Sequence, residues 1–386
     1  MARALELVQV EKELAERYGC SEDYDPPDIL ARARIDTPGA LHDLNELYNL
    51  RMRTQLPRQL PQSRRQPSSA LRHRVNASRF WGVIVGVNAY EDAPLLGSVE
   101  DAFRMKHLLI DVFGVPREQI KTLVGIEERP SPDNSCAPTR ANIIKALRDL
   151  VDNRLIRHGD NIVIYFSGHG TSYTESDYEN YSDLAREAIS YIAGDGHPIK
   201  LFPIEALCPI DRNTIDSDGS PVPDISDREI NAILTEIAHA KGHHITVILD
   251  CCHSGGATRN AAALGTRKSI PPLEGAALIA MFRIGSKTLQ QFPGHHSLWA
   301  PGWRPDMKSH VILAACKDHE FAREGSRGSQ YYGIFTDSLV NVLKSSFRRT
   351  GMGTTYADLG NMVKSGLYQT PVVAGDRRHS YLWYQT

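Results

Sequence analysis

Two segments of the sequence end apolar runs with side chains that can do chemistry. Residues 243–256 read HHITVILDCCHSGG, where a β-branched apolar run ends in an acid and two thiols, Cys251 and Cys252. Residues 160–170 read DNIVIYFSGHG and end with His169 between two glycines. A thiolate is the nucleophilic form of cysteine, and a neighbouring imidazole makes it available near neutral pH. The two segments together predict a cysteine nucleophile with a histidine base.

Buried parallel strands are the elements that would bring these side chains together. A short apolar run bounded by polar residues is typical of a central strand, and ligands bind beyond the carboxyl ends of such strands. His169 and a thiol would then reach the same edge of the sheet. Because neighbouring residues of an extended strand face opposite ways, Cys251 and Cys252 cannot both face the histidine. The residues alone leave open which thiol acts.

Each of these residues also has a non-catalytic reading. A histidine after a strand is more often structural, and a buried cysteine commonly behaves as a small apolar side chain. A Cys-Cys-His cluster could suggest a metal site, but adjacent ligands lack the spacing of zinc sites. The agreement of two strand-terminal motifs favours the catalytic thiol.

The two motifs, YFSGHG at 165–170 and DCCHSGG at 250–256, resemble those of the metacaspases, within the caspase-like clan of cysteine peptidases. The resemblance covers roughly residues 78–384, and the motifs are specific as a pair although each is weak alone. It implies a three-layer α/β caspase-like (caspase-hemoglobinase) fold, with a mostly parallel central sheet and helices on both faces.

The resemblance also implies the roles of the site residues. His169 would be the general base and Cys252 the nucleophile, with Cys251 at a position where the family usually has Ser. Backbone N–H groups of Cys252 and Gly170 would stabilise the oxyanion, as acyl transfer requires. No metal is required for this chemistry.

Three acidic residues are candidates for substrate binding. The resemblance implies that Asp101 lines the specificity pocket, and with Asp250, two residues before the nucleophile, it would make an acidic pocket that suits an Arg or Lys before the cleaved bond. Asp211 is a candidate third member. Each has a plainer reading, as a helix-start acid for Asp101, a strand-end acid for Asp250 and a loop acid for Asp211. The occurrence of two acids together favours specificity for Arg or Lys.

The pattern of elements agrees with an α/β fold. Helical segments alternate with apolar runs, which argues for parallel strands with helices on both faces. The expected strands are 80–88, 119–124, the apolar runs within 160–170 and 243–256, and 310–316, and the expected helices include 98–113, 139–153 and 226–242.

The chain divides into three parts on composition. Residues 1–46 read as a helical N-terminal segment, 47–77 as a basic linker rich in Pro, Gln and Arg, and 78–386 as the peptidase domain. The linker is read as a solvated tether, with a cleavable pro-segment as the alternative. Residues 256–307 show no periodic element and read as a mobile insertion in the domain.

Composition excludes several classes of protein. A net charge of −2 over 386 residues gives no pull toward nucleic acid or a membrane, and no apolar run reaches the ~20 residues that span a bilayer. Six cysteines without regular spacing fit a reducing compartment such as the cytoplasm. The glycines near 82–86 are not followed by a phosphate-binding loop.

Calcium is a candidate cofactor because of the family resemblance. Metacaspases often use calcium through an acidic run between the two motifs, but residues 193–197 read AGDGH and lack the paired acids. The Asp216–Gly219 segment lacks the spacing of an EF-hand loop. The chemistry therefore requires no cofactor, and activation by calcium stays open but is not favoured.

These observations predict a cysteine endopeptidase that cuts proteins or peptides after Arg or Lys and uses a Cys-His dyad. The basic linker and the 256–307 insertion would make the chain a substrate of itself. The alternative is a caspase-like module that is catalytically weak or inactive and acts as a regulatory binding domain.

Overall fold

The computed structural model describes residues 76–126, 134–173, 203–252, 266–267, 270–290, 298, 303–317, 320–348, 354–363 and 369–384. The expected N-terminal segment 1–46 lies outside this part, as do the linker 47–77 except for its last two residues and the acidic run 193–197. Within the described residues, no helix has the length and apolarity to cross a membrane.

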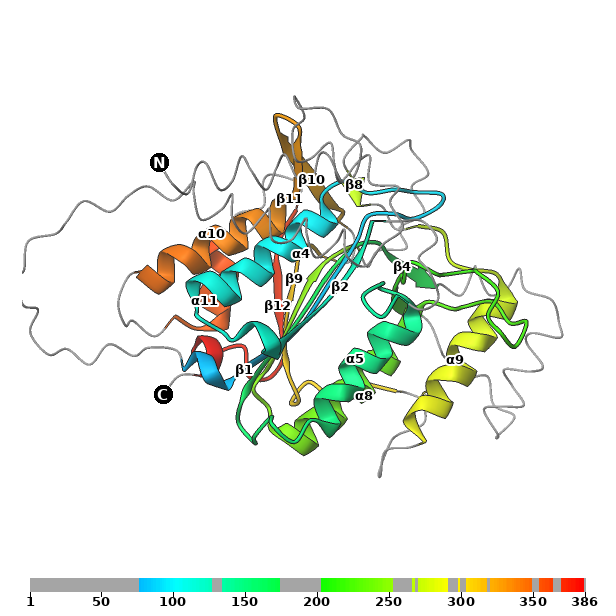
Figure 1. Ribbon diagram of the computed structural model, residues 1–386, viewed down its shortest axis with the longest axis horizontal. Coiled ribbons are helices and arrows are strands. Elements are labelled where there is room, and N and C mark those ends of the chain that lie inside the picture. Colours follow the sequence, from blue (N-terminus) through cyan, green and yellow to red (C-terminus); the bar gives the residue numbers. More distant parts are fainter. Residues whose placement is uncertain are drawn as a thin grey trace, which may run out of the picture. The chain divides into compact units, whose positions relative to one another are not determined.

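A six-stranded sheet forms the centre of the described fold (Figure 1). Its order is β12-β9-β7-β3-β1-β2, and all neighbours are parallel except β12, which runs antiparallel to β9 at one edge. The strands are β1 (Phe80–Val87), β2 (Ile120–Gly125), β3 (Asn161–Ser167), β7 (Ile245–Asp250), β9 (Val311–Ala314) and β12 (Val372–Ala374). The predicted mostly parallel sheet is confirmed.

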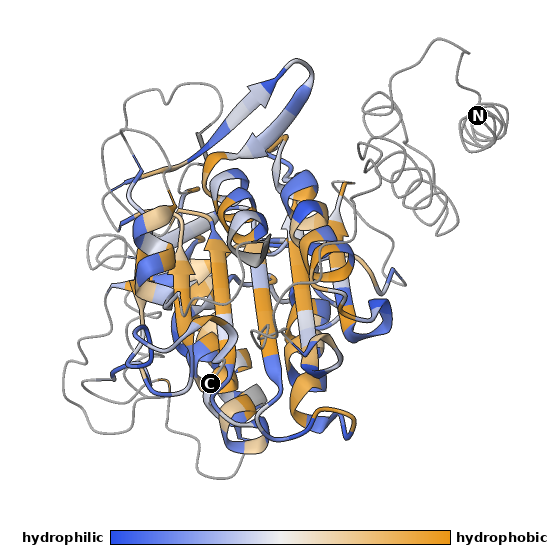
Figure 2. Ribbon diagram, turned by 90° about the vertical axis from the view of Figure 1, so that its left-hand side faces the viewer, coloured by the Kyte–Doolittle hydropathy of each residue, from blue (hydrophilic) through white to orange (hydrophobic). Residues whose placement is uncertain are grey.

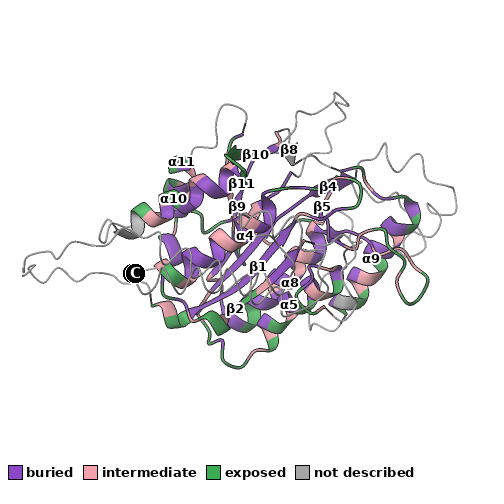
Figure 3. Cartoon of the chain, turned by 45° about the horizontal axis from the view of Figure 1, so that its top comes forward, coloured by how far each residue is buried: buried purple, intermediate pink, exposed green. Residues whose placement is uncertain are grey.

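The strands are apolar because helices cover both of their faces. All eight residues of β1 are buried, and Figure 2 shows the central strands as mainly hydrophobic. Figure 3 shows the central strands as mostly buried, while exposed residues collect on the outer helix faces, and the edge strand β12 is only partly buried.

Two layers of helices sandwich the sheet (Figure 1). On one side, α5 and α8 pack in an apolar cluster with Val83 and Val85 of β1, and α9 lies against α8. On the other side, α4 packs closely on β1 because Gly86 has no side chain between them. The helices are α4 (Ser98–His107), α5 (Arg140–Asp152), α8 (Asp227–Lys241), α9 (Gly275–Leu289), α10 (Ile334–Arg348) and α11 (Tyr356–Met362).

Local sequence determines where two of these helices begin. The Thr139 side chain accepts a hydrogen bond from the amide of Asn142 at the start of α5, and Ser226 does the same from Glu229 at the start of α8. Such caps satisfy amides that have no partner within the helix. The predicted helix starts agree with the structure.

Two three-stranded sheets lie beyond the carboxyl ends of the central strands. One has the order β4-β5-β6 and the other β11-β10-β8, and both are antiparallel. They consist of β4 (Gly170–Tyr173), β5 (Ile204–Leu207), β6 (Ile225–Ser226), β8 (Thr266–Arg267), β10 (Ala322–Arg327) and β11 (Gln330–Gly333).

The expectation that residues 256–307 contain no regular element is wrong, because α9 spans Gly275–Leu289. Its sequence, GAALIAMFRIGSKTL, is apolar on nearly every side, so no polar face marks the helical period. Buried Leu278, Met281 and Phe282 belong to the apolar cluster beside α8.

Candidate active site

The candidate site lies where two adjacent strands of the central sheet end. Strands β1, β3 and β7 are neighbours, and Gly86, Ser167 and Asp250 are paired in one row across them. The chain leaves β3 through His169 and leaves β7 through Cys252, at the same edge of the sheet. The topology therefore brings together the two residues expected to form the dyad.

Hydrogen bonds to two loops, the one between β1 and α4 and the one that follows β5, fix the position of His169, which is 2% exposed. Its amide donates to the Tyr90 hydroxyl at 2.9 Å, and the two rings are 4.7 Å apart between centroids. The Tyr90 hydroxyl in turn donates to the carbonyl of Cys208 at 2.9 Å. The ring atom Nε2 lies 2.7 Å from the carbonyl oxygen of Ala93. A carbonyl can only accept, so Nε2 carries a proton and Nδ1 is the basic nitrogen of the neutral ring.

Gly170 is in direct contact with the backbone of Cys252. A β-carbon at position 170 would overlap the carbonyl oxygen of Cys252, so only glycine allows this approach. The loop that carries His169 is thereby held against the residue that carries the candidate nucleophile.

The two neighbouring thiols have different surroundings. Cys251 belongs to the apolar cluster on the α5 and α8 side of the sheet, together with Tyr90. The sulfur of Cys252 accepts a hydrogen bond of 3.0 Å from the amide of Ala322, at the start of β10. A backbone N–H directed at a sulfur stabilises negative charge there. Cys252 is fully buried.

Asp101 and Asp250 are brought together at the start of α10. Asp101 accepts a hydrogen bond from the amide of Gly333 at 2.7 Å. Asp250 accepts from the amide and the hydroxyl of Thr336, at 3.2 and 2.6 Å. Both carboxylates are fully buried, and both stabilise the first turn of α10, where negative charge is favourable.

Two buried serines beside these carboxylates were not found by sequence reasoning. Ser167 is in the same row as Asp250, and Ser98 belongs to the first turn of α4, which also carries Asp101. Both serines are 0% exposed, and their hydroxyls have no hydrogen-bond partner within the described residues. Buried hydroxyls usually have a partner, so this polar group fits a site that receives a polar ligand.

Asp211 is not brought together with the other two acids. Its carboxylate accepts a hydrogen bond of 2.8 Å from the amide of Arg140, at the start of α5 on the opposite side of the sheet. Burial raises the pKa of Asp211, and the Arg140 amide partly offsets the rise. The contact is that of an acid at a helix start.

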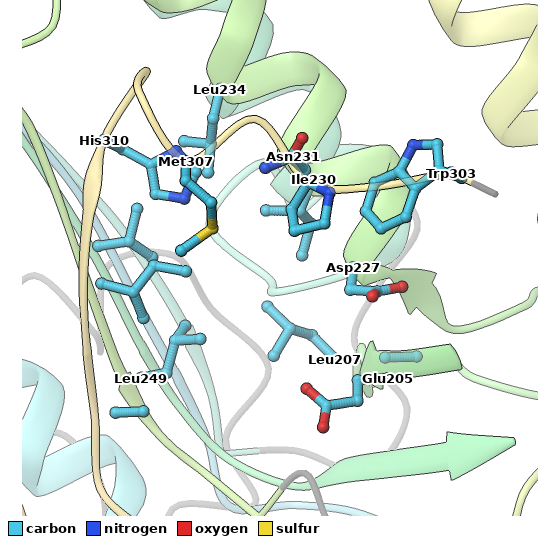
Figure 4. A pocket seen from close by; sticks show the side chains of 15 residues that line it. Glu205, Leu207, Asp227, Ile230, Asn231, Leu234, Leu249, Trp303, Met307 and His310 are labelled. Atoms are coloured by element: carbon cyan, nitrogen blue, oxygen red, sulfur yellow. The ribbon is translucent and has the colours of Figure 1, made fainter. Parts of the chain in front are cut away.

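A cavity of about 250 Å³ lies on the α8 side of β7 and β9 (Figure 4). Its lining is mainly apolar and includes Leu234, Leu249 and Met307. Glu205 and Asp227 contribute two carboxylates to the lining of the cavity. Burial, together with the negative charge of Glu205, raises the pKa of Asp227 to about 7. None of the residues that line it is a predicted site residue.

Within the described part of the chain, no group of three or more His, Cys, Asp or Glu residues could hold a metal ion. Residues 193–197, at the position where metacaspases often carry an acidic run, lie outside the described residues.

Comparison with known proteins agrees with this architecture. The model of the caspase domain family matches residues 79–381. Metacaspase-3 of Arabidopsis thaliana is 30% identical over 291 residues, which are 74% of this chain and 64% of that protein. Metacaspase-1 of the same plant is 26% identical over 293 residues, with 75% and 64% covered. The chain therefore spans less than two thirds of the length of these relatives.

A solved Geobacter sulfurreducens protein resembles the fold with a TM-score of 0.48 and 19% identity, covering 76% of this chain and 92% of that one. The family match covers most of the chain and includes both strand-terminal motifs. The chain belongs to the caspase domain family, and its similarity is to the metacaspases.

Proposed function

We propose that this chain is a cysteine endopeptidase that hydrolyses peptide bonds after Arg or Lys through a dyad of Cys252 and His169. One observation carries the proposal. His169 and Cys252 directly follow the ends of the adjacent parallel strands β3 and β7, and Gly170 lies against the carbonyl of Cys252. The caspase domain family supports the peptidase class.

The contacts of the dyad support acyl transfer. Nδ1 of His169 takes the thiol proton, while Nε2 stays bonded to the Ala93 carbonyl and keeps the ring oriented. The Cys252 thiolate attacks the carbonyl carbon of the substrate, and the amides of Cys252 and Gly170 stabilise the oxyanion. His169 then gives its proton to the leaving amine, and water releases the acyl-enzyme.

Four buried polar side chains, those of Asp101, Asp250, Ser98 and Ser167, support selection of a basic side chain. Asp101 and Asp250 supply two negative charges, and the hydroxyls of Ser98 and Ser167 supply acceptors for a guanidinium or an ammonium. Charge-assisted hydrogen bonds in a desolvated site are strong, so Arg and Lys are favoured over neutral side chains. Asp211, on the other side of the sheet, is not part of this pocket in the proposal.

The proposal extends to the chain as its own substrate. β8 pairs antiparallel with β10, so that Arg267 is opposite Ala322, the residue whose amide contacts the Cys252 sulfur. An extended peptide that pairs with a strand edge is a common way to bind a substrate. This register supports Thr266–Arg267 as a segment that occupies the substrate position. Intact mass after incubation, compared with a Cys252→Ala variant, tests self-cleavage, and an unchanged mass would count against it.

A second candidate function is a regulatory binding module without strong activity. Its support is the burial of the dyad, since His169 is 2% and Cys252 0% exposed. The two candidates differ in thiol chemistry, because an activated thiol is alkylated well below the pH of ~8.5 where a free cysteine ionises.

The proposed nucleophile must remain reduced, which supports the cytoplasm as the place of action.

The deciding experiment is a panel of fluorogenic peptide amides with Arg, Lys or Asp before the cleaved bond, with and without calcium. The expected result is cleavage after Arg and Lys, none after Asp, and loss of cleavage in Cys252→Ala. Activity in Cys252→Ala together with a dead Cys251→Ala variant would assign the nucleophile to the neighbouring thiol. Inactivity of the wild type on every peptide would favour the binding module.

A further inference from the structure

A second thiol, Cys316, contacts the proposed nucleophile from the neighbouring strand. β9 lies beside β7, and the amide of Ala315 donates to the carbonyl of Leu249 at 2.9 Å. The next residue along the chain puts the sulfur of Cys316 within 3.9 Å of the carbonyl oxygen of Cys251. The side chain of Cys252 is also the largest cause of a raised pKa at Cys316.

Backbone groups hold both sulfurs in place. The Cys252 sulfur accepts from the amide of Ala322 at 3.0 Å, and the Cys316 thiol lies 3.5 Å from the carbonyl of Glu320. The two thiols are 0% and 4% exposed. The amide of Ala322 and the carbonyl of Glu320, two residues apart, thus hold the two sulfurs at the same turn of chain where β10 begins. A disulfide requires the two sulfurs to approach to about 2 Å.

We propose that Cys252 and Cys316 are an oxidisable pair that closes to an intramolecular disulfide when a hydroperoxide reacts with Cys252. The closed form has no nucleophile, so oxidation switches the site off, and reduction by a dithiol restores it. The disulfide itself depends only on the thiol geometry. Its effect on peptide cleavage rests on the proposed function.

The reaction is a two-electron oxidation in two steps. First, the Cys252 thiolate attacks the hydroperoxide, an S–O bond forms, the O–O bond breaks, and the leaving alkoxide or hydroxide takes up a proton. This gives a sulfenic acid. Second, the Cys316 sulfur attacks the Cys252 sulfur, an S–S bond forms, the S–O bond breaks, and hydroxide leaves with the Cys316 proton as water. Two thiols are oxidised, and the hydroperoxide is reduced to an alcohol or water.

The order of these steps follows from charge. The side chain of Cys252, with burial, raises the pKa of Cys316, so Cys316 stays protonated beside its neighbour. A sulfenic acid carries no charge, so the first step weakens the largest of the causes that keep Cys316 protonated, while burial remains. Cys252 is therefore attacked by the oxidant and Cys316 is the resolving thiol.

The other described cysteines are less suited to this role. Burial, with the nearby Asp224, raises the pKa of Cys208, which keeps that thiol protonated and inert. Cys251 belongs to the apolar cluster under α8. Cys136 is exposed, in the segment that precedes α5. It therefore serves as a control.

The test is peptide mapping of the full chain after brief treatment with hydrogen peroxide, alkylation of remaining thiols, and trypsin digestion. Residues 242–259, with Cys251 and Cys252, and residues 309–317, with Cys316, are separate tryptic peptides. The expected product is a cross-link of the two, about 2 Da lighter than their reduced sum. It should persist in Cys251→Ser and in Cys136→Ser, and be absent from Cys252→Ser and from Cys316→Ser.

Activity gives an independent readout. Peroxide should lower cleavage of an Arg peptide at least tenfold in the wild type and in Cys136→Ser, and dithiothreitol should restore it. In Cys316→Ser, the lost activity should return incompletely, because an unresolved sulfenic acid oxidises further. A wild-type chain without the cross-link, or a cross-link that survives in Cys252→Ser, overturns the proposal. A cross-link in a chain that cleaves no peptide refutes the peptidase function and leaves the thiol pair standing.

Discussion

The carbonyl oxygen of Cys252 lies against the α-carbon of Gly170, so closely that the position tolerates no side chain. This contact joins the two chain segments that follow β3 and β7, and it holds the candidate base next to the candidate nucleophile. The geometry of the dyad therefore depends on a residue that has no functional group.

Replacing Gly170 by Ala should lower kcat/KM on an Arg peptide by about 100-fold or more, because displacement of a catalytic group by about 1 Å has an effect of that size. Gly328→Ala is the control. Gly328 lies in the turn between β10 and β11 with a φ of +63° and open space around it, so the change should cost only about 1 kcal/mol of stability. Full activity of Gly170→Ala would show that the contact does not position the dyad.

Isosteric substitution should separate two roles of Asp101 and Asp250, the binding of a basic substrate through their charge and the stabilisation of the start of α10. Asn keeps an oxygen that can accept from the α10 amides but removes the charge that would hold a guanidinium. Asp101→Asn and Asp250→Asn should each lower kcat/KM for an Arg peptide by roughly 10- to 100-fold, equivalent to a charged hydrogen bond.

Asp160→Asn is the matched control for this pair. Asp160 is also buried, and it accepts from Arg79 and Trp81 at the opposite end of β3. That variant should lose stability in denaturant unfolding and keep its activity while folded. Equal losses of activity in all three variants would mean that Asp101 and Asp250 act through the fold and not through the substrate.

The sequence predicted those parts of the site that one strand carries within itself. His169 and Cys252 each follow an apolar run. Glycines flank His169, and Cys252 has polar neighbours, so a local pattern marks both residues. The mostly parallel sheet followed from the same runs, because apolar strands alternate with capped helices. Asp101 and Asp250 were predicted as a pair from the family resemblance, and the fold brings them to the start of one helix.

The contacts that orient these residues come from distant segments, which no local pattern encodes. Tyr90 is 79 residues from His169, and Ala322 is 70 residues from Cys252. Ser98 and Ser167 read as an ordinary helix-start residue and strand residue until the sheet row and α4 bring them together. Helix α9 was missed because an apolar helix shows no periodicity, which is a limit of pattern reading for buried elements.

The hydroxyl of Tyr90 connects His169 to Cys208, since it accepts from one backbone and donates to the other. Tyr90→Phe keeps the ring beside the imidazole and removes both hydrogen bonds. Because two buried backbone groups lose their partner, the free energy of unfolding should fall by about 1–3 kcal/mol. The His169 loop should also loosen, and kcat should fall more than KM changes. Unchanged kcat with lowered stability would make Tyr90 purely structural.

His310, at the start of β9, should make the fold sensitive to acid. It is 2% exposed, its Nδ1 atom is 2.6 Å from the Ser309 hydroxyl, and burial lowers its pKa to about 4 against a weak opposing effect of Asp306. The folded pKa lies below the unfolded value of ~6.5, so the neutral ring is favoured in the fold. Its contribution to stability is complete above about pH 6.5 and is lost as the pH falls toward about 4.

We therefore expect the free energy of unfolding, measured in urea, to fall less between about pH 7 and about pH 4.5 in His310→Asn than in the wild type. The difference should be up to about 3 kcal/mol. His239→Asn is the control, because His239 is exposed on α8, 3.9 Å from Glu236, and should retain the wild-type slope. The same pH dependence in His310→Asn and the wild type would show that other buried groups cause the acid sensitivity.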